Sequence, residues 1–163
     1  MGHTVKIFRT LALALALAFV PALAHAWPGT VTKIHDGDSI TVRPDSGKPT
    51  KIRLWGIDCP EYRQAYGKAA TEFVRLLLPI GSRVEVEEID RDRYGRTVAI
   101  VSRGGDTVQA ALLRAGLAWV YERYYRERGG NWPRIEADAK AARRGLWKDE
   151  EPTPPWVWRK MKR

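Results

Sequence analysis

The alternation of apolar and polar residues between positions 31 and 101 predicts about five short β-strands. Apolar residues alternate at Ile40 and Val42, and again at Ile52 and Leu54, which is the period of a half-buried strand. The predicted strands cover residues 31–35, 39–43, 51–57, a segment around 84–86, and 97–101. Asp36-Gly37 lies between the first two and is typical of a tight hairpin turn.

Three other segments have the period of an amphipathic helix. The first places Ala69, Phe73, Leu76, Leu77 and Ile80 on one face and ends at Pro79 and Gly81. The second has the stripe Val108, Ala111, Leu112 and Ala115 before Gly116, and the third has Ile135, Ala139, Ala142 and Leu146 between Asn131 and Gly145. Five short strands with about three helices, inserted after the third and fifth strands, indicate an α+β protein built on a small closed barrel of the OB-fold type.

The first 26 residues have the pattern of a secretory signal peptide. Lys6 and Arg9 form a positive n-region, residues 11–19 are almost wholly Leu and Ala, and Ala24-His25-Ala26 fits a cleavage site. A membrane anchor is the alternative, but the apolar stretch is shorter than the ~20 residues that a spanning helix needs. We therefore expect cleavage after Ala26, export to the periplasm or the medium, and no membrane association of the mature chain.

Removal of this 26-residue leader from the 163-residue chain leaves 137 residues, which is the size of one domain. The leader carries two basic and no acidic residues, so its loss lowers the formal net charge from +9 to +7. A positive charge favours nucleic acid, acidic polysaccharide or an anionic membrane surface as partner, but a solubilising surface has the same signature. Charge alone therefore leaves the partner open.

Cys59 is the only cysteine, so the chain can form no internal disulfide. Cysteine catalysis would need an activating base, and His35 is the single histidine after residue 26. Thiolate chemistry is therefore the weaker hypothesis, and we expect Cys59 to be unpaired.

Residues 149–163 form a basic tail rich in Pro and Trp, for which we expect an irregular conformation. Its tryptophans, Trp156 and Trp158, have two interpretations. They could stack on nucleobases, or they could fasten the tail to the domain, and their place in a Pro-rich terminus favours the second. The folded domain is then expected to span residues 27–148.

Four polar clusters lie at the predicted strand ends and turns, namely Asp36-Gly37-Asp38, Arg53, Asp58-Cys59-Pro60-Glu61 and Asp92-Arg93-Tyr94-Gly95-Arg96. Each has a plain structural explanation, as a hairpin turn, an exposed strand cation, loop acids or a turn before a strand. Together they fit the hydrolysis of a phosphodiester. That reaction needs a hard cation on oxygen ligands, a carboxylate that acts on water, and guanidinium groups on the phosphoryl oxygens.

The segments Asp36–Ser39, Arg53–Glu61 and Tyr94–Arg96 closely resemble staphylococcal nuclease and its relatives, in the same order and with similar spacing. The resemblance extends from about residue 31 to 147. It includes Ala-Leu-Leu-Arg-Ala-Gly-Leu-Ala at 111–118 and Gly-Leu-Trp at 145–147. Any single cluster is a weak match, but the whole series is specific.

The resemblance implies an OB-fold nuclease that hydrolyses DNA and RNA with calcium and leaves 3′-phosphate ends. Asp38 and Asp58 would be the carboxylate ligands of Ca²⁺, and Cys59 would contribute its backbone carbonyl. Arg53, Glu61 and Arg96 would be the catalytic residues, with Glu61 acting on the attacking water and the two arginines on the phosphate. Cys59 stands where the best-known member has Thr, but any residue supplies a carbonyl.

The resemblance also implies tyrosines beside the nucleotide. Tyr94 matches one of them, and Tyr124 or Tyr121 corresponds to the aromatic wall that follows the second long helix. A tyrosine stacked on a base adds roughly 1–3 kcal/mol without selecting its sequence. For Tyr121, packing of a helix against the barrel is an equally good explanation.

We therefore expect an exported, monomeric nuclease that acts on nucleic acid without a protein partner and with weak sequence preference. One alternative is a non-catalytic OB-fold protein that binds single-stranded nucleic acid, and another is an envelope protein that holds acidic polysaccharide. The acids Asp38, Asp58 and Glu61 argue against pure binding, because unpaired carboxylates repel a phosphate ligand.

Overall fold

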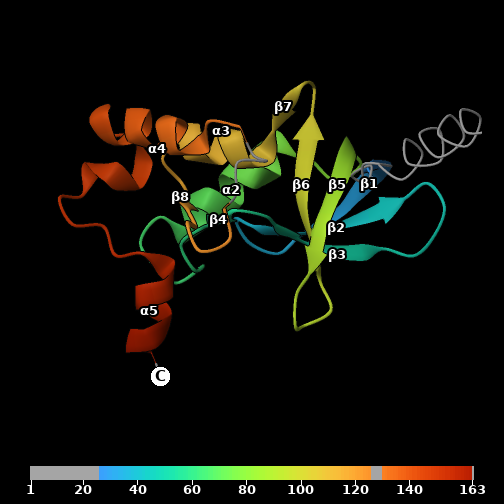
Figure 1. Ribbon diagram of the computed structural model, residues 1–163, viewed down its shortest axis with the longest axis horizontal. Coiled ribbons are helices and arrows are strands. Elements are labelled where there is room, and N and C mark those ends of the chain that lie inside the picture. The colour runs from blue at the N-terminus through green and yellow to red at the C-terminus, as the bar shows by residue number, and fades with distance from the viewer. Residues whose placement is uncertain (1–25, 126–129, 163) are drawn as a thin grey trace, which may run out of the picture.

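The computed structural model describes residues 26–125 and 130–162, and Figure 1 shows how their elements are arranged. The strands are β1 (Ala26–Ile34), β2 (Ser39–Pro44), β3 (Thr50–Leu54), β4 (Ile57–Asp58), β5 (Arg83–Arg91), β6 (Thr97–Arg103), β7 (Asp106–Thr107) and β8 (Trp119–Val120). The helices are α2 (Gly67–Leu77), α3 (Val108–Arg114), α4 (Trp132–Ala141), the 3-10 helix η2 (Gly145–Lys148) and α5 (Pro155–Met161). The predicted signal peptide, apart from Ala26, lies outside the described residues.

Five of these strands form a closed barrel of mixed strand directions. Strand β1 pairs antiparallel with β2 and β5, and the pairs β2–β3 and β5–β6 are antiparallel as well. Parallel pairing between β3 and β6 closes the sheet, with Arg53 opposite Val98 at its centre. The predicted α+β fold with a five-stranded OB-type barrel is therefore confirmed.

Alternate side chains of the strands fill the barrel. The fully buried set includes Val31, Ile40, Val42, Ile52, Leu54, Val86, Ala99 and Val101. Burial of each of the Val, Ile and Leu side chains stabilises the fold by roughly 1.5–3 kcal/mol relative to leaving it exposed. Because successive residues of a strand point to opposite faces, Arg53 lies on the other face of β3 from Ile52 and Leu54.

The segment predicted as one strand at 51–57 is two short strands, β3 and β4. Trp55 and Gly56 form a turn between them, and Gly56 has a positive φ of 72°. This left-handed conformation favours glycine and ends β3. Strand β4 then pairs with β8, with Asp58 opposite Trp119, which fixes the backbone of Asp58 outside the main barrel.

Helix α2 is where it was predicted, but only part of the predicted apolar face is covered: Phe73 and Leu77 pack partly buried against the core. Leu76 is 80% exposed and Ile80, beyond the end of the helix, is 65% exposed. The buried residues of the helix are instead Gly67, Ala70, Thr71 and Val74. Small residues let α2 approach the loops beside it closely, and this signal is not contained in hydrophobicity alone.

The second and third predicted helices are present as α3 and α4. Helix α3 begins after Thr107, whose hydroxyl accepts the N–H of Ala110 at 3.1 Å as an N-cap. The predicted third helix ends earlier than expected, and Leu146 lies in η2. Its backbone N–H donates to the carbonyl of Gly116 at 2.9 Å, which joins η2 to the end of α3.

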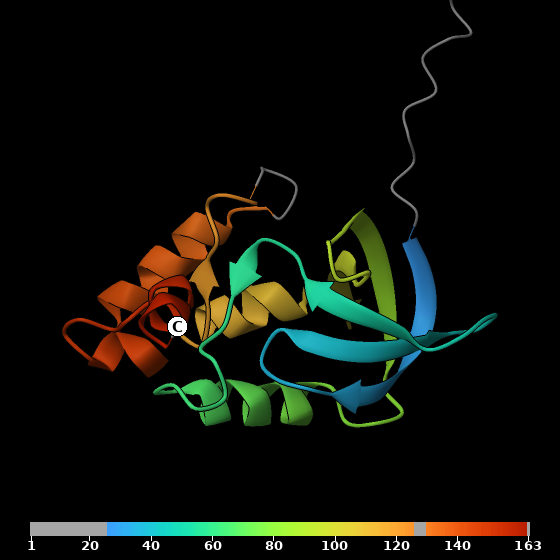
Figure 2. The same cartoon turned by 90° about the horizontal axis from the view of Figure 1, so that it is seen from below.

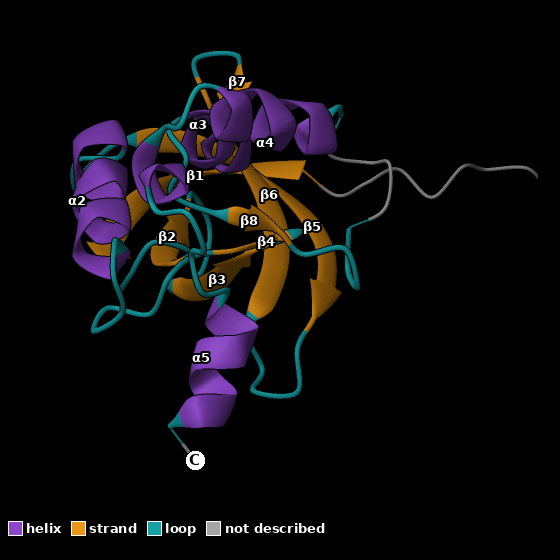
Figure 3. Cartoon of the chain, turned by 90° about the vertical axis from the view of Figure 1, so that its left-hand side faces the viewer, coloured by secondary structure: helices purple, strands orange, loops and turns teal. Residues whose placement is uncertain are grey.

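The tail is not irregular as predicted, because residues 155–161 form the helix α5. Pro154 and Pro155 favour a helix start here, since proline is well tolerated in the first turn. Figure 2 shows α5 on the same side of the barrel as α4, and Figure 3 shows it at the opposite end of the molecule from β7. The four α-helices of the described residues include none that is long and apolar enough to cross a membrane.

The tail tryptophans dock as predicted, most clearly at Trp156. Its ring stacks on Tyr121 with centroids 5.2 Å apart and planes 8° apart, and it lies edge-on to Trp119 at 6.4 Å. Trp158 is half-buried, with the Lys162 ammonium 5.0 Å from its ring centroid. The tail is therefore packed on the domain rather than extended away from it.

Candidate active site

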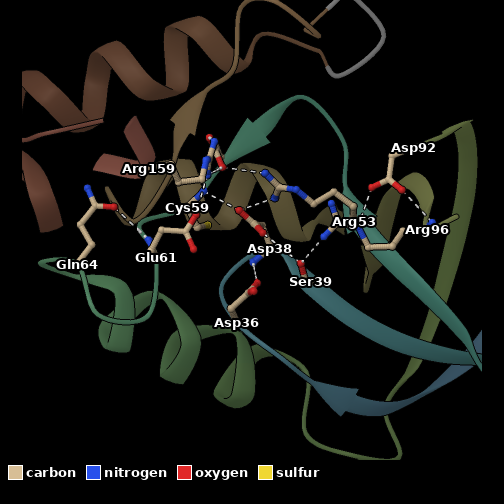
Figure 4. Close-up of polar contacts among 11 residues, drawn as sticks. Asp36, Asp38, Ser39, Arg53, Cys59, Glu61, Gln64, Asp92, Arg96 and Arg159 are labelled. Atoms are coloured by element: carbon tan, nitrogen blue, oxygen red, sulfur yellow. Dashed lines mark hydrogen bonds and ion pairs between the residues drawn. The ribbon is translucent and has the colours of Figure 1, made fainter. Parts of the chain in front are cut away.

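The turn between β1 and β2 positions Asp38. Asp36 Oδ1 accepts the backbone N–H of Asp38 at 3.0 Å, a side-chain bond that holds the turn. A Cβ on Gly37 would lie 2.9 Å from the Cβ atoms of Ala70 and Cys59, so only glycine fits there. Asp38 Oδ2 then accepts the N–H of Cys59 at 2.7 Å, as Figure 4 shows.

Arg53 on β3 lies between two carboxylates. Its Nη1 pairs with Asp38 Oδ2, and its Nη2 donates to Asp58 Oδ1 at 2.8 Å. The Arg53 side chain is 16% exposed and that of Asp58 is 1% exposed. Burial alone would lower the pKa of Arg53, but the negative charges of Asp38 and Asp58 raise it above its usual range. The guanidinium therefore remains charged.

Asp58 is the last residue of β4, and Cys59 follows it directly. Burial raises the pKa of the Asp58 carboxyl, while the hydrogen bond from Arg159 and the charge of Arg53 act in the opposite direction. Burial also raises the pKa of the Cys59 thiol well above its usual range. A buried neutral thiol is a poor nucleophile, which further weakens the cysteine hypothesis.

Glu61 lies at the start of the segment that leads into α2. Its N–H donates to Gln64 Oε1 at 3.1 Å, and its carbonyl accepts the N–H of Gln64 at 2.8 Å. Gly67 packs on the same carbonyl so closely that a Cβ there would lie 1.8 Å from it. The backbone is thus held firmly, while the Glu61 side chain is 43% exposed and accessible to water.

Arg159 of α5 contacts the acids of this cluster, and no sequence pattern predicted these contacts. Its Nη2 donates to Asp58 Oδ2 at 2.7 Å, and its Nη1 donates to Glu61 Oε1 at 2.7 Å and to Asp58 Oδ1 at 3.3 Å. The hydrogen bond with Asp58 raises the pKa of Arg159 above its usual range. Arg159 is 98 residues from Glu61, in a tail without any recognisable motif, and only its basic composition hinted at a role.

Arg96 lies at the edge of this cluster, just before β6. Asp92 holds it, because Asp92 Oδ2 accepts Arg96 Nε at 2.7 Å and Asp92 Oδ1 accepts the Arg96 N–H at 2.9 Å. Arg96 Nη1 donates to Ser39 Oγ at 3.4 Å, next to Asp38 in the chain. Burial would raise the pKa of Asp92, but the hydrogen bonds from Arg96 lower it below its usual value. The sequence assigned no role to Asp92.

The tyrosines lie outside the charged cluster. Tyr94 is 69% exposed, with the guanidinium carbon of Arg96 5.7 Å from its ring centroid. Tyr124 is 53% exposed and packs edge-on against Tyr121 at 5.1 Å. In the described parts of the chain, no hydrogen bond or ion pair joins Tyr94 or Tyr124 to Asp38, Asp58 or Glu61. Exposure leaves both rings open to a base.

The carboxylates of Asp38 and Asp58 and the Cys59 carbonyl are oxygen donors of the kind that a hard cation prefers. Three carboxylates crowd this corner, and burial together with the charge of Asp38 raises the pKa of Asp36 to about 6. A surplus of negative charge on oxygen atoms is what calcium and magnesium prefer. Within residues 26–125 and 130–162 no group of three or more His, Cys, Asp or Glu forms a metal cluster. The predicted set is not such a group, because it has two side chains and a carbonyl.

Comparison with known proteins relates the sequence of this chain to a family. Residues 51–149 match the family described as staphylococcal nuclease homologue. An uncharacterized endonuclease of Escherichia coli O157:H7 is 41% identical over 143 residues, which cover 87% of this chain and 91% of that protein. A micrococcal nuclease of Shigella flexneri is 35% identical over 171 residues, covering 98% and 96%. Protein ParB of Escherichia coli is 37% identical over 167 residues, covering 95% and 93%.

These relatives match the chain over nearly their whole length. The residues that match the family include Arg53 on β3, Asp58 on β4 and Arg96 just before β6. The barrel closed by β3 and β6 has the architecture that the resemblance implied. The chain therefore belongs to the staphylococcal nuclease family, a family of metal-dependent nucleases.

Proposed function

We propose that this chain is a calcium-dependent nuclease that hydrolyses phosphodiester bonds of DNA and RNA with little sequence preference. The observation that carries the proposal is the position of Arg53, a guanidinium between Asp38 and Asp58, with Glu61 nearby. A protein that only binds nucleic acid gains nothing from carboxylates at this place, because they repel phosphate. Hydrolysis, in contrast, uses the negative carboxylates as well as the positive guanidinium.

Asp38, Asp58 and the carbonyl of Cys59 would hold the calcium ion. Bound there, calcium supplies positive charge that neutralises the phosphate and favours attack by water. Asp38 is kept in place by the N–H of Cys59, and Asp58 by the pairing of β4 with β8. Rigid positioning of both carboxylates lowers the free-energy cost of binding the ion.

Arg53 and Arg96 would bind the non-bridging oxygens of the scissile phosphate. A guanidinium presents two parallel N–H donors to such oxygens and keeps its proton at any physiological pH. Charge on these oxygens grows as a fifth oxygen approaches phosphorus, so both arginines stabilise the transition state more than the substrate. Asp92 keeps the Arg96 fork oriented for this contact.

Glu61 would orient the attacking water and accept its proton. The oxygen of that water forms a bond to phosphorus while the bond from phosphorus to the 5′ oxygen breaks. The 5′ oxygen leaves with the electron pair and is protonated, whereas the 3′ oxygen stays on phosphorus. The proposed products therefore carry a 3′-phosphate and a 5′-hydroxyl.

Cleavage of single-stranded DNA tests this proposal. We expect the purified chain to degrade denatured DNA in calcium and to leave it intact in chelator. Glu61→Gln and Arg53→Ala should each lower the rate by about 10² or more. Arg43→Ala, which removes an exposed arginine of the neighbouring strand β2, is the matched control and should leave the rate unchanged.

Two outcomes would contradict parts of the proposal. Retardation of DNA in a gel without cleavage over hours would indicate the binding protein instead of the enzyme. Full activity in both Glu61→Gln and Arg53→Ala would show that the site is misassigned. The end group has its own test, because products with a 3′-phosphate support primer extension only after phosphatase treatment.

We further propose that residues 1–26 direct export and are removed, which leaves a monomeric periplasmic or secreted enzyme. The new first residue would be Trp27, whose Nε1 donates to Glu88 Oε1 at 2.7 Å. A mass measurement on the exported protein should then correspond to a chain that starts at Trp27. Retention of the leader in the exported form would contradict this proposal.

A further inference from the structure

We propose that α5 is an intramolecular inhibitor of the active site, in which Arg159 occupies Asp58, one of the proposed calcium ligands, together with Glu61, and Trp156 covers Tyr121, on which a base would stack. This inference rests on the proposed function, since it concerns access to the same site. Calcium and nucleic acid would displace α5, and the enzyme would be active in the displaced state. The following contacts support it.

Arg159 engages both oxygens of Asp58. Asp58 Oδ2 accepts Nη2 at 2.7 Å, and Asp58 Oδ1 accepts both Arg159 Nη1 at 3.3 Å and Arg53 Nη2 at 2.8 Å. Asp58 is 1% exposed, so it cannot turn to solvent to find another partner. A calcium ion on either oxygen would lie against the Arg159 guanidinium, and two cations at this distance repel each other. The two therefore compete for Asp58.

The same guanidinium also restrains Glu61. Its Nη1 donates to Glu61 Oε1 at 2.7 Å, the group proposed to accept a proton from water. In the docked state Glu61 Oε1 is therefore held by Arg159 and is not free to bind the attacking water.

Trp156 also covers Tyr121, which the family resemblance offered beside Tyr124 as the aromatic wall next to the nucleotide. Its ring lies parallel to Tyr121, with centroids 5.2 Å apart and planes at 8°, which is the geometry of a base on an aromatic platform. The edge of Trp119 contacts the same indole. A nucleobase and Trp156 cannot occupy this face of Tyr121 together, so α5 blocks a stacking position as well as the carboxylates.

The attachment of α5 is shallow enough to be reversible. Within α5 only Pro155 is buried, and Val157 and Met161 are 38% and 70% exposed. Arg159 is itself 41% exposed, so solvent weakens its ion pairs. Segments with few buried contacts open at much lower free energy than the core. Release of α5 therefore leaves the barrel folded.

The loop that carries Glu61 is tied to the tail, which couples the two. Gln64 Oε1 accepts the N–H of Glu61 at 3.1 Å, while Gln64 Nε2 donates to the carbonyl of Thr153 at 2.5 Å. A single side chain thus links the catalytic loop to the residues just before α5.

Calcium binding without nucleic acid tests the proposal. Calcium chloride is titrated calorimetrically into the full mature chain and into Arg159→Ala, Arg159→Lys and Lys160→Ala. We expect Arg159→Ala to bind calcium about tenfold more tightly, because the competing cation is gone and the binding-competent fraction rises. Arg159→Lys should be intermediate, since an ammonium lacks the fork. Lys160→Ala removes an exposed charge from the same helix and should match the wild type.

Amide hydrogen exchange gives a second readout that does not depend on catalysis. In the wild type, exchange in residues 155–161 should be slow in chelator and faster in saturating calcium. In Arg159→Ala and in Trp156→Ala it should already be fast in chelator. Equal calcium affinity of wild type and Arg159→Ala, or exchange in α5 that calcium does not change, would overturn the proposal.

Cleavage assays separate this inference from the proposed function. We expect Arg159→Ala to reach half-maximal rate at lower calcium than the wild type, with a maximal rate that is not reduced. A lower maximal rate at saturating calcium would make Arg159 part of the catalytic machinery and would refute an inhibitory role. If no variant binds calcium or cleaves DNA, the proposed function fails, and the inhibitor has no cation to exclude.

Discussion

Arg53 is a cation whose side chain is 16% exposed and whose two partners come from different parts of the chain. Asp38 is in the turn before β2 and Asp58 is in β4, and each keeps an oxygen on the Arg53 guanidinium. Desolvation of three charges is expensive, and their mutual attraction offsets this cost only while all three are present. The triad is thus a part of the fold as well as of the proposed site.

Replacement of Arg53 by Ala should destabilise the fold by about 3–5 kcal/mol in chelator, because Asp38 and Asp58 lose the guanidinium between them and Asp58 keeps its pair with the more exposed Arg159. Calcium should restore part of this loss, since it neutralises the same carboxylates. Thermal unfolding in chelator and in calcium measures both effects. Arg53→Lys keeps the charge and should lose less stability, so equal losses in the two variants would contradict a charge-based explanation.

Asp92 is a positioning residue for Arg96 in the proposed mechanism. Asp92→Ala removes both hydrogen bonds to Arg96, and we expect kcat/KM to fall about tenfold as the guanidinium loses its orientation. Arg96→Ala supplies the control. In that background Asp92→Ala should cost little more, whereas full additivity of the two losses would show that Asp92 acts elsewhere.

The interaction between Asp92 and Arg96 makes the stability of the fold depend on pH. The pKa of Asp92 in the folded state lies below the ordinary 3.8, because Arg96 favours the charged carboxylate. Its stabilising effect is therefore fully present above pH 3.8 and is lost as the pH falls through the lower folded-state value. Wild type and Asp92→Ala should differ in urea midpoint at neutral pH and converge in acid. A constant difference across this range would contradict the assignment.

The elements meet at a close backbone contact between α3 and η2. Gly116 ends α3 with φ +69°, and a Cβ there would lie 2.2 Å from the carbonyl oxygen of Arg144. Gly145, at the start of η2, faces the Gly116 carbonyl equally closely. This contact holds the C-terminal helices on the barrel and so sets where the tail begins.

Gly116→Ala should destabilise the protein by about 3 kcal/mol or more, through a strained φ and a backbone clash. Gly104→Ala separates the two causes, because Gly104 has φ +62° and nothing within 4 Å of its Cβ position. Only the strain remains there, and the loss should be about 1 kcal/mol. Chemical denaturation measures both, and equal losses would rule out the clash as the main cause.

Sequence patterns predicted elements well where one period dominates. The alternation at Ile40, Val42, Ile52 and Leu54 reports a barrel interior directly, and those side chains are fully buried. Part of the buried face of α2 was missed because Gly67 and Ala70 are buried for their small size. The helix α5 was missed because prolines and tryptophans dominate its first turn and conceal any amphipathic stripe.

The chain carries a formal net charge of +9, or +7 without the predicted leader. In the proposed function this charge attracts nucleic acid without selecting its sequence, since the contacts are to phosphate. Binding should therefore weaken strongly with salt. The effect belongs to the entire charge distribution and not to one residue.

The Glu61→Gln variant in calcium allows the salt dependence of nucleic-acid binding to be measured without cleavage. Fluorescence anisotropy with a short single-stranded oligonucleotide should show log K falling linearly with log salt. Adding Arg96→Ala should reduce the steepness by about 0.7, the value for one lost phosphate contact on a single strand. Arg43→Ala is again the exposed control. An unchanged slope in the Arg96 variant would remove Arg96 from the phosphate site.

Local patterns along the chain were enough to predict the barrel, its class and the cluster of Arg53, Asp58 and Glu61. These residues lie within nine positions of one another, so a short stretch of backbone is sufficient to bring them together. Asp38 and Arg96 required the resemblance to a family, because they come from other loops. Their roles in catalysis remain predictions that the variants above test.

Only the tertiary structure revealed Arg159 and the stacking of Trp156 on Tyr121. Arg159 is 98 residues from Glu61 and 101 from Asp58, and their contact depends on the path of every helix between them. No period or spacing encodes such a path, because it results from the packing of α3, α4 and η2 on the barrel. Asp58 and Glu61 can be found from the local sequence. Arg159, which pairs with both acids in the docked state, is brought to them only by the fold.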